Sequence, residues 1–102
     1  MINGTRNEVK YGLENMKHHA NSRLVPPGSS GWTLGVHVFT RRGVSQRLID
    51  HEAIHVWQYA RDGVPKFLVL YLWDYFRNLM KFRHHRTAYL NIRYEIEVDK
   101  LL

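Results

Sequence analysis

Hydrophobic residues recur along most of this chain with the spacing of helices. The first such segment runs from about residue 7 to residue 20, and its apolar positions lie three or four apart: Val9, Leu13, Met16 and Ala20. We expect a helix here, closed at its C-terminal end by His18 and His19. Residues 24–31, LVPPGSSG, are rich in proline, glycine and serine and predict a loop.

The next segment alternates instead. Apolar side chains between residues 32 and 39 stand at every second position, which is typical of a strand: Trp32, Leu34, Val36 and Val38. Gly35 predicts a bend or a hairpin within it. His37 lies among the alternating positions and is expected to face outward, towards solvent or a cleft.

Helical spacing returns after the strand. Ser45 is a suitable N-cap for a helix that runs to about Asp62, with Gly63 as its stop signal. Its apolar stripe comprises Ile49, Ala53, Val56, Trp57 and Ala60. Pro65 marks the start of a third helix over residues 66–83.

The third helix is expected to be amphipathic. Its polar positions form one stripe: Asp74, Arg77, Asn78 and Lys81. Its apolar positions lie on the other side, which should face the core: Leu72, Tyr75, Phe76, Leu79 and Phe82. His84 and His85 should cap the C-terminal end of this helix.

The remaining chain predicts an irregular segment over residues 87–92 and a short helix over residues 94–102. The whole pattern indicates an α+β fold, mostly helical, with one strand or hairpin. With 102 residues, the chain is long enough for one domain, residues 1–102, around one modest core.

Composition narrows the possible chemistry. There is no cysteine, so any metal must be held by His, Asp or Glu. The formal charge is +6, from 15 Lys and Arg against 9 Asp and Glu, but the basic residues are scattered, so nucleic acid is not the favoured partner. No apolar run is long enough for a signal peptide or a transmembrane segment, which predicts a cytoplasmic protein or one associated with a virion.

The motif HEAIH, residues 51–55, is the strongest chemical signal. On a helix His51 and His55 lie about 40° apart and one turn removed, so both imidazoles can reach one ion. Glu52 is placed to the side, where it can take a proton from a water on that ion. The same pattern would also fit an ordinary amphipathic helix whose histidines border the core.

A third ligand could come from the segment YEIEVD, residues 94–99. If this segment is helical, Glu95 and Asp99 share a face. Glu95 could then complete a His2Glu site, and Asp99 could accept the second ring N–H of a ligating histidine. Glu97 remains the alternative ligand, and a solvated acidic helix is the alternative structure.

Several motifs in order resemble the gluzincin type of zinc peptidase, and most closely a group of small bacterial and phage HExxH domains. The matching pieces span residues 31–99: WTLGVHVF, HEAIHVWQ, YLWDYFRNL and AYLNIRYEIEV. This resemblance implies a minimal zincin-like domain with His51, His55 and Glu95 as zinc ligands, Glu52 as general base and Asp99 behind the ligands. The chain has Arg93 where the family often has proline, and Val98 where it often has alanine.

The expected function is therefore a zinc metallopeptidase that cleaves peptide bonds with a zinc-activated water and Glu52 as base. Residues 32–39 would supply an edge strand that pairs with extended substrate. Four side chains are candidates to stabilise an oxyanion: Tyr59, His84, His85 and Tyr89. Gln58 is expected to be a helix-surface amide. The alternative is a catalytically inactive, zinc-stabilised structural or interaction protein of a larger assembly, such as a phage particle.

Overall fold

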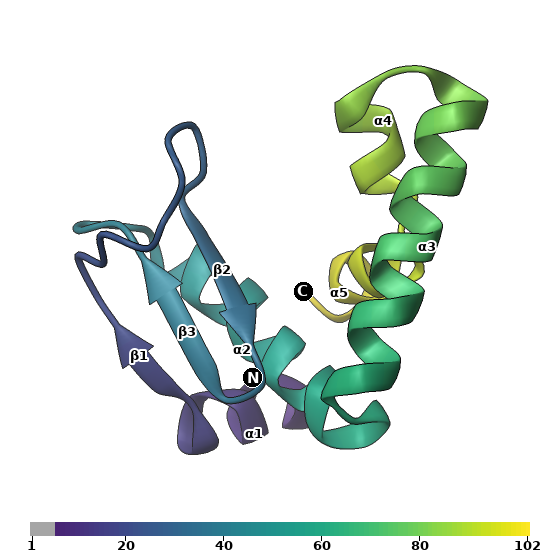
Figure 1. Cartoon of the computed structure of the whole chain (residues 1–102). Helices are drawn as coiled ribbons and strands as arrows, with labels where there is room; N and C mark the ends of the chain where they lie inside the picture. The colour runs from purple at the N-terminus through teal and green to yellow at the C-terminus, as the bar shows by residue number, and fades with distance from the viewer. Residues whose placement is uncertain (1–5) are drawn as a thin grey trace.

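The computed structural model describes residues 6–102 and confirms an α+β fold that is mostly helical (Figure 1). The elements follow in the order α1 (Asn7–Asn15), β1 (Lys17–His19), β2 (Gly31–Leu34), β3 (His37–Thr40), α2 (Gln46–Asp62), α3 (Val64–Phe82), α4 (His85–Leu90) and α5 (Arg93–Leu101). The sheet and α1 lie on one side of α2, and α3 and α4 lie on the other (Figure 1). Across residues 6–102, no helix has the length and apolar character needed to cross a membrane.

The first helix is shorter than predicted. It ends at Asn15, and Met16 already has an extended backbone. Lys17–His19 form β1, which pairs in parallel with β3, so the prediction that His18 and His19 close the helix was wrong. The apolar spacing of Met16 and Ala20 reflects local sequence only. The backbone hydrogen bonds that make this segment a strand come from β3, about twenty residues away along the chain.

The predicted strand is a hairpin of β2 and β3. Its turn contains Gly35 with φ +62°, a left-handed conformation that glycine adopts without strain. The register pairs Trp32 with Phe39 and Leu34 with His37. The strand order β1-β3-β2 leaves β2 at the edge of the sheet. His37 is exposed, as expected.

Helix α2 begins and ends where the sequence predicts. The Ser45 side chain accepts a hydrogen bond from the Leu48 amide, and Gly63 ends the helix with φ +85°. The helix is buried on more sides than its apolar stripe suggests, because it contacts α1, the sheet, α3 and α5. Glu52 and His55 are therefore inside the protein instead of bordering the core, while Ala60 is exposed.

Helix α3 faces the core with a different side from the one predicted, although Arg77 and Lys81 are exposed as expected and Tyr75 packs against the core. Asp74 and Asn78, from the predicted outer stripe, are buried. Leu72, Phe76 and Phe82, from the predicted inner stripe, are exposed. The reason is that buried polar groups on α3 form hydrogen bonds with residues of α4 and α5.

Asp74 and Asn78 connect α3 to the C-terminal part of the chain. The Asp74 carboxylate accepts hydrogen bonds from the Arg93 backbone N–H (3.1 Å), Nε (2.7 Å) and Nη2 (2.9 Å). The Asn78 amide donates to the Ala88 carbonyl at 3.2 Å. These bonds hold the first residue of α5 and the middle of α4 against α3, and they satisfy polar groups that burial would otherwise penalise.

The segment predicted to be irregular forms α4 over residues 85–90. His84 is the N-cap of α4, where its side chain accepts from the Thr87 amide. Arg83, in a left-handed conformation with φ +55°, is the C-cap of α3. The prediction that His84 and His85 cap α3 was therefore wrong, because a single left-handed residue ends α3 and the chain at once enters another helix.

The packing of α1 on α2 depends on a glycine. A Cβ on Gly12 would lie inside the van der Waals radius of the Ala53 carbonyl group of α2. We expect Gly12→Ala to lower the free energy of unfolding by about 1–3 kcal/mol, although alanine forms helices better than glycine by about 1 kcal/mol. Chemical denaturation would measure this, with Glu14→Ala, an exposed position on the same helix, as the matched control. Equal stability of the two variants would contradict the close approach.

Candidate metal centre

Two helices bring three metal-ligand side chains together. His51 and His55 lie one turn apart on α2, with ring centroids 5.0 Å from each other. Glu95 reaches them from α5: its Oε1 is 3.0 Å from His51 Nε2, and its Oε2 is 3.1 Å from His55 Nε2. One ligand atom from each residue can be chosen so that all three lie within 4.8 Å of one another. This group could hold a metal ion.

Glu95 reaches the histidines because the start of α5 is fixed. The Asp74–Arg93 hydrogen bonds described above hold the backbone two residues before Glu95. Gln58 on α2 also donates to the Tyr94 carbonyl at 2.9 Å. The carboxylate is then placed with only 2% of the residue exposed.

Gln58 is not the surface amide that the sequence suggested. It is fully buried, and its Oε1 lies 2.8 Å from His55 Nδ1, so it accepts the ring N–H when His55 presents Nε2 to a metal. Its Nε2 donates to the Tyr94 carbonyl and to Glu97 Oε1. The signal was present in the sequence, as the glutamine three residues after the second histidine in HEAIHVWQ.

Glu97 lies apart from the two histidines. Its Oε1 accepts from Gln58 at 2.8 Å and its Oε2 from Arg61 at 2.7 Å. Partial burial opposes ionisation of Glu97, but the bonds from Arg61 and Gln58 outweigh it and lower the pKa of this carboxyl. Glu97 is therefore not among the side chains that cluster with the two histidines, whereas Glu95 is.

Asp99 is exposed on α5. It lines a small surface pocket of about 310 Å³ together with His51. Within residues 6–102 no hydrogen bond joins the two side chains, so the role of Asp99 behind His51 stays a prediction.

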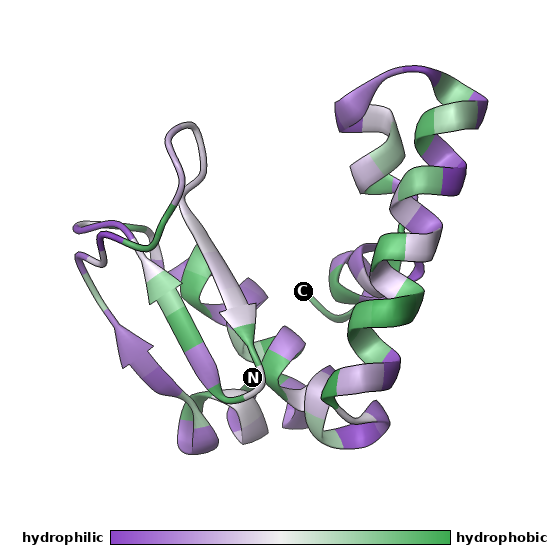
Figure 2. Cartoon of the chain, viewed as in Figure 1, coloured by the Kyte–Doolittle hydropathy of each residue, from purple (hydrophilic) through white to green (hydrophobic). Residues whose placement is uncertain are grey.

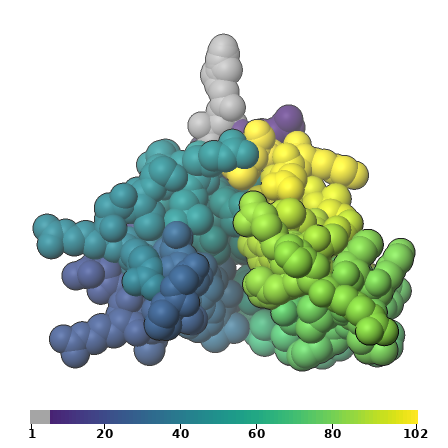
Figure 3. Space-filling view, turned by 90° about the horizontal axis from the view of Figure 1, so that it is seen from above, coloured from purple at the N-terminus to yellow at the C-terminus, as the bar shows by residue number. Residues whose placement is uncertain are grey.

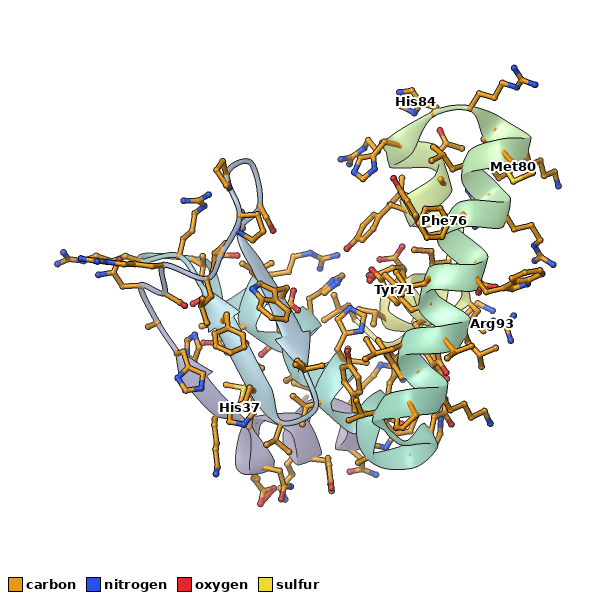
Figure 4. All side chains as sticks on the ribbon, viewed as in Figure 1. His37, Tyr71, Phe76, Met80, His84 and Arg93 are labelled. Atoms are coloured by element: carbon orange, nitrogen blue, oxygen red, sulfur yellow. The ribbon has the colours of Figure 1, made fainter. Side chains whose placement is uncertain are left out.

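Tyr71 on α3 is a site residue that sequence reasoning missed. Its hydroxyl donates to Glu95 Oε2 at 2.7 Å, and it points from α3 towards the middle of the molecule (Figure 4). Burial and the adjacent Glu95 raise the pKa of Tyr71, which keeps it a donor at all ordinary pH values. No local pattern marks this tyrosine, because it lies among many aromatic residues on α3.

In the absence of a metal, the buried side chains of His55 and Glu95 favour each other's charged form. Burial lowers the pKa of His55, but the charge and hydrogen bond of Glu95 outweigh it and raise this pKa from 6.5 to about 9. Burial raises the pKa of Glu95, but His55, His51 and Tyr71 outweigh it and lower this pKa well below its usual range. A metal ion at this site must therefore displace a proton from His55.

Glu52 projects from α2 into the same region but is not one of the three clustered side chains. It is 5% exposed, and its Oε1 accepts from the Thr33 hydroxyl of β2 at 2.8 Å. Thr33 was not among the predicted site residues, because it comes from a strand nineteen positions earlier. The bond fixes one carboxylate oxygen and leaves the other for a further partner.

A cleft of about 670 Å³ opens beside Glu52, His55 and Glu95. It lies between β2 and α2 on one side and α3 and α4 on the other, and the view from above shows these two halves (Figure 3). Its size is within the range of small-molecule sites.

Three of the four predicted oxyanion candidates line this cleft: Tyr59, His85 and Tyr89. The Tyr59 hydroxyl donates to the Thr33 carbonyl at 3.0 Å, and His85 Nδ1 lies 2.7 Å from the Tyr75 hydroxyl. His84 is not among the lining residues. Arg86, which sequence reasoning did not consider, does line the cleft and adds a cation to its wall.

No protein family matches this chain, and neither curated proteins nor solved structures show significant similarity to it. The resemblance to gluzincins thus stays a prediction.

The metal ligands can be tested by mass spectrometry of the intact protein after equilibration with zinc. We expect about one ion per chain in the parent, and loss of the ion in His55→Ala and Glu95→Ala. Glu97→Ala is the matched control on the same helix and should keep the ion, although with weaker affinity because Gln58 loses a partner. Loss with Glu97→Ala and retention with Glu95→Ala would overturn the assignment.

The raised pKa of His55 predicts opposite pH trends with and without metal. In the metal-free protein, the protonated His55 contributes stability that is fully present below pH 6.5 and is lost as pH rises through about 9. With zinc, stability should increase over the same range, because the metal needs the neutral imidazole.

Thermal unfolding from pH 6 to 9.5, with a chelator or with zinc, would measure both trends. The metal-free Glu95→Gln variant should no longer lose stability as pH rises, because the carboxylate charge that raises the pKa of His55 is gone. A metal-free parent that becomes more stable towards pH 9 would contradict the charged pair.

Proposed function

We propose that the protein is a zinc-dependent hydrolase that cleaves peptide bonds. The single observation that supports this most is a His2Glu donor set, of which the buried His55 and Glu95 line the same cleft as a separate carboxylate, Glu52. Two imidazoles and one carboxylate, without sulfur ligands, are a common donor set of catalytic zinc. Three protein ligands also leave a coordination position for water, whereas structural zinc sites are usually closed by four.

Zinc bound to these ligands would polarise a water molecule and lower its pKa towards neutrality. The protein itself supplies the other requirements. Glu52 accepts the proton from the attacking water through the carboxylate oxygen that Thr33 leaves free, and then delivers it to the leaving amine.

The surrounding residues orient the ligands. Gln58 accepts from His55 Nδ1 and so fixes the tautomer that presents Nε2. Tyr71 donates to Glu95 Oε2 and limits the rotation of that carboxylate. His55, Gln58 and Glu95 are all at most 5% exposed, so two of the three ligands lie in a setting that excludes bulk water.

An extended peptide fits the position of the sheet edge. Residues Gly31–Thr33 of edge strand β2 line the cleft in part, next to Glu52. Strand addition at this edge would align the peptide backbone along β2 and bring a carbonyl towards the ligands. Tyr89 and Arg86 on the opposite wall are then the donors available for the developing oxyanion.

The alternative is a metal-stabilised structural or interaction module, including a part of a phage particle. It is favoured by the position of Glu95, because a metal shared by α2 and α5 would hold the two helices together whether or not the protein is a catalyst. The two functions differ in their need for Glu52, which is not one of the three clustered ligands.

Glu52→Gln therefore separates them. We expect this variant to retain the metal and to lose at least about 100-fold in peptide hydrolysis, since it removes the proton acceptor. The assay would use a library of quenched fluorescent peptides with the zinc-loaded protein. Asp50→Asn, on the same helix and hydrogen-bonded only to Gln46 within the described chain, is the matched control and should retain activity.

Undiminished turnover by Glu52→Gln would contradict its role as general base. A zinc-loaded parent that cleaves no member of the library would favour the structural alternative.

A further inference from the structure

Helix α3 presents an unusual apolar face to solvent. Five large apolar residues on it are more than half exposed: Val69 (66%), Leu72 (52%), Trp73 (61%), Phe76 (58%) and Met80 (78%). Figure 2 shows hydrophobic residues along α3, and Phe76 and Met80 can be located on it in Figure 4. Single exposed apolar residues are normal on a protein surface, but a continuous set marks a binding surface.

These five residues form one stripe. At 100° per residue they fall within an arc of about 100°, over a length of about 16 Å. The opposite side of α3 carries the residues buried against the rest of the protein, namely Phe67, Asp74 and Asn78. The stripe therefore lies on the side of the helix away from these tertiary contacts. Leu72, at one edge of the arc, also lines the cleft, but α4 and α5 leave all five residues more than half exposed.

The exposed charges that α3 and α4 themselves carry are of one sign, although Asp62 and Glu97 lie near Lys66 at the start of α3. Residues 63–92 contain five Lys and Arg side chains: Lys66, Arg77, Lys81, Arg83 and Arg86. Their only acidic residue is Asp74, which is buried and paired with Arg93. The part of the surface formed by α3 and α4 thus has exposed cations and no exposed carboxylate.

The cations are placed beside the stripe and not within it. On the helical wheel Lys66, Arg77 and Lys81 follow one flank of the apolar arc, within about 60–120° of Val69. All three are exposed, so their long side chains can extend towards a charged surface while the apolar residues enter a non-polar one.

We propose that α3 binds the surface of an anionic lipid membrane. The helix lies in the plane of the interface, its apolar stripe enters the boundary between headgroups and acyl chains, and its basic flank contacts lipid phosphates. Trp73 is suited to this position, because an indole ring places an apolar body and a polar N–H at the same depth.

The charge distribution favours lipid over a second copy of the chain. A symmetric pair of α3 helices would bring two basic flanks together, with no exposed acid from residues 63–92 to compensate them. Apart from Leu72, which also lines the cleft, the stripe lies on the convex surface of one helix and offers no groove for a second peptide. An extended anionic surface satisfies both the apolar and the basic side chains.

Co-sedimentation with vesicles tests the proposal. We expect the protein to bind vesicles of equal parts phosphatidylcholine and phosphatidylglycerol, and to bind those of phosphatidylcholine alone at least about tenfold more weakly. Trp73 fluorescence should shift to shorter wavelength on binding, and this shift should be absent in Trp73→Phe.

Two pairs of variants separate the apolar and basic contributions. Phe76→Ser/Met80→Ser should weaken binding about tenfold or more, whereas Leu24→Ser, at a 63% exposed position in a loop, should not. Arg77→Gln/Lys81→Gln should also weaken binding, and Lys10→Gln/Arg42→Gln, with the same change of net charge elsewhere, should do so by less than about threefold. Circular dichroism and metal content would confirm that each variant is folded.

Three results would overturn the proposal. One is no binding to anionic vesicles by the folded parent protein. Another is equal binding by Phe76→Ser/Met80→Ser and the parent. The third is lipid-free dimerisation that Phe76→Ser/Met80→Ser abolishes, because the stripe would then be an interface between copies of the chain.

Discussion

A buried carboxylate between two imidazoles is the interaction on which the rest of this structure depends. Glu95 is ionised in an environment that would disfavour the charge, and His51, His55 and Tyr71 compensate it. Removing a charge from water costs several kcal/mol unless such partners are in place. The fold must therefore hold α2, α3 and α5 in one arrangement, since each contributes a group to this contact.

The same requirement explains why the interior is unusually polar for a small domain. Gln58, Asp74 and Asn78 are buried, and each is hydrogen-bonded to a neighbouring element. Among residues 6–102 no buried side-chain nitrogen or oxygen lacks a partner. Such networks fix positions more strictly than apolar packing does, and a metal or catalytic site needs that precision.

The orientation of α3 is a consequence of this polar interior. Because Asp74 faces inward, its carboxylate accepts hydrogen bonds from the backbone and side chain of Arg93 at the start of α5. The same orientation turns Leu72, Trp73 and Phe76 towards solvent. Exposing apolar area costs about 25 cal/mol per Å². Binding to a membrane surface would remove that cost. The orientation of α3 therefore links the candidate metal centre, on the inner side of the helix, to the proposed membrane-binding stripe on its other side.

The sequence by itself determined the features that depend on near neighbours. Ser45 and Gly63 delimit α2 through bonds within a few residues, and the spacing of His51 and His55 follows from helix geometry. It also supplied Glu95 as a ligand candidate. Tertiary structure decided β1, the direction in which α3 faces, the bond of Thr33 to Glu52, and the roles of Gln58 and Tyr71. These depend on partners far along the chain, or on the packing of the surrounding helices, and local periodicity carries no information about either.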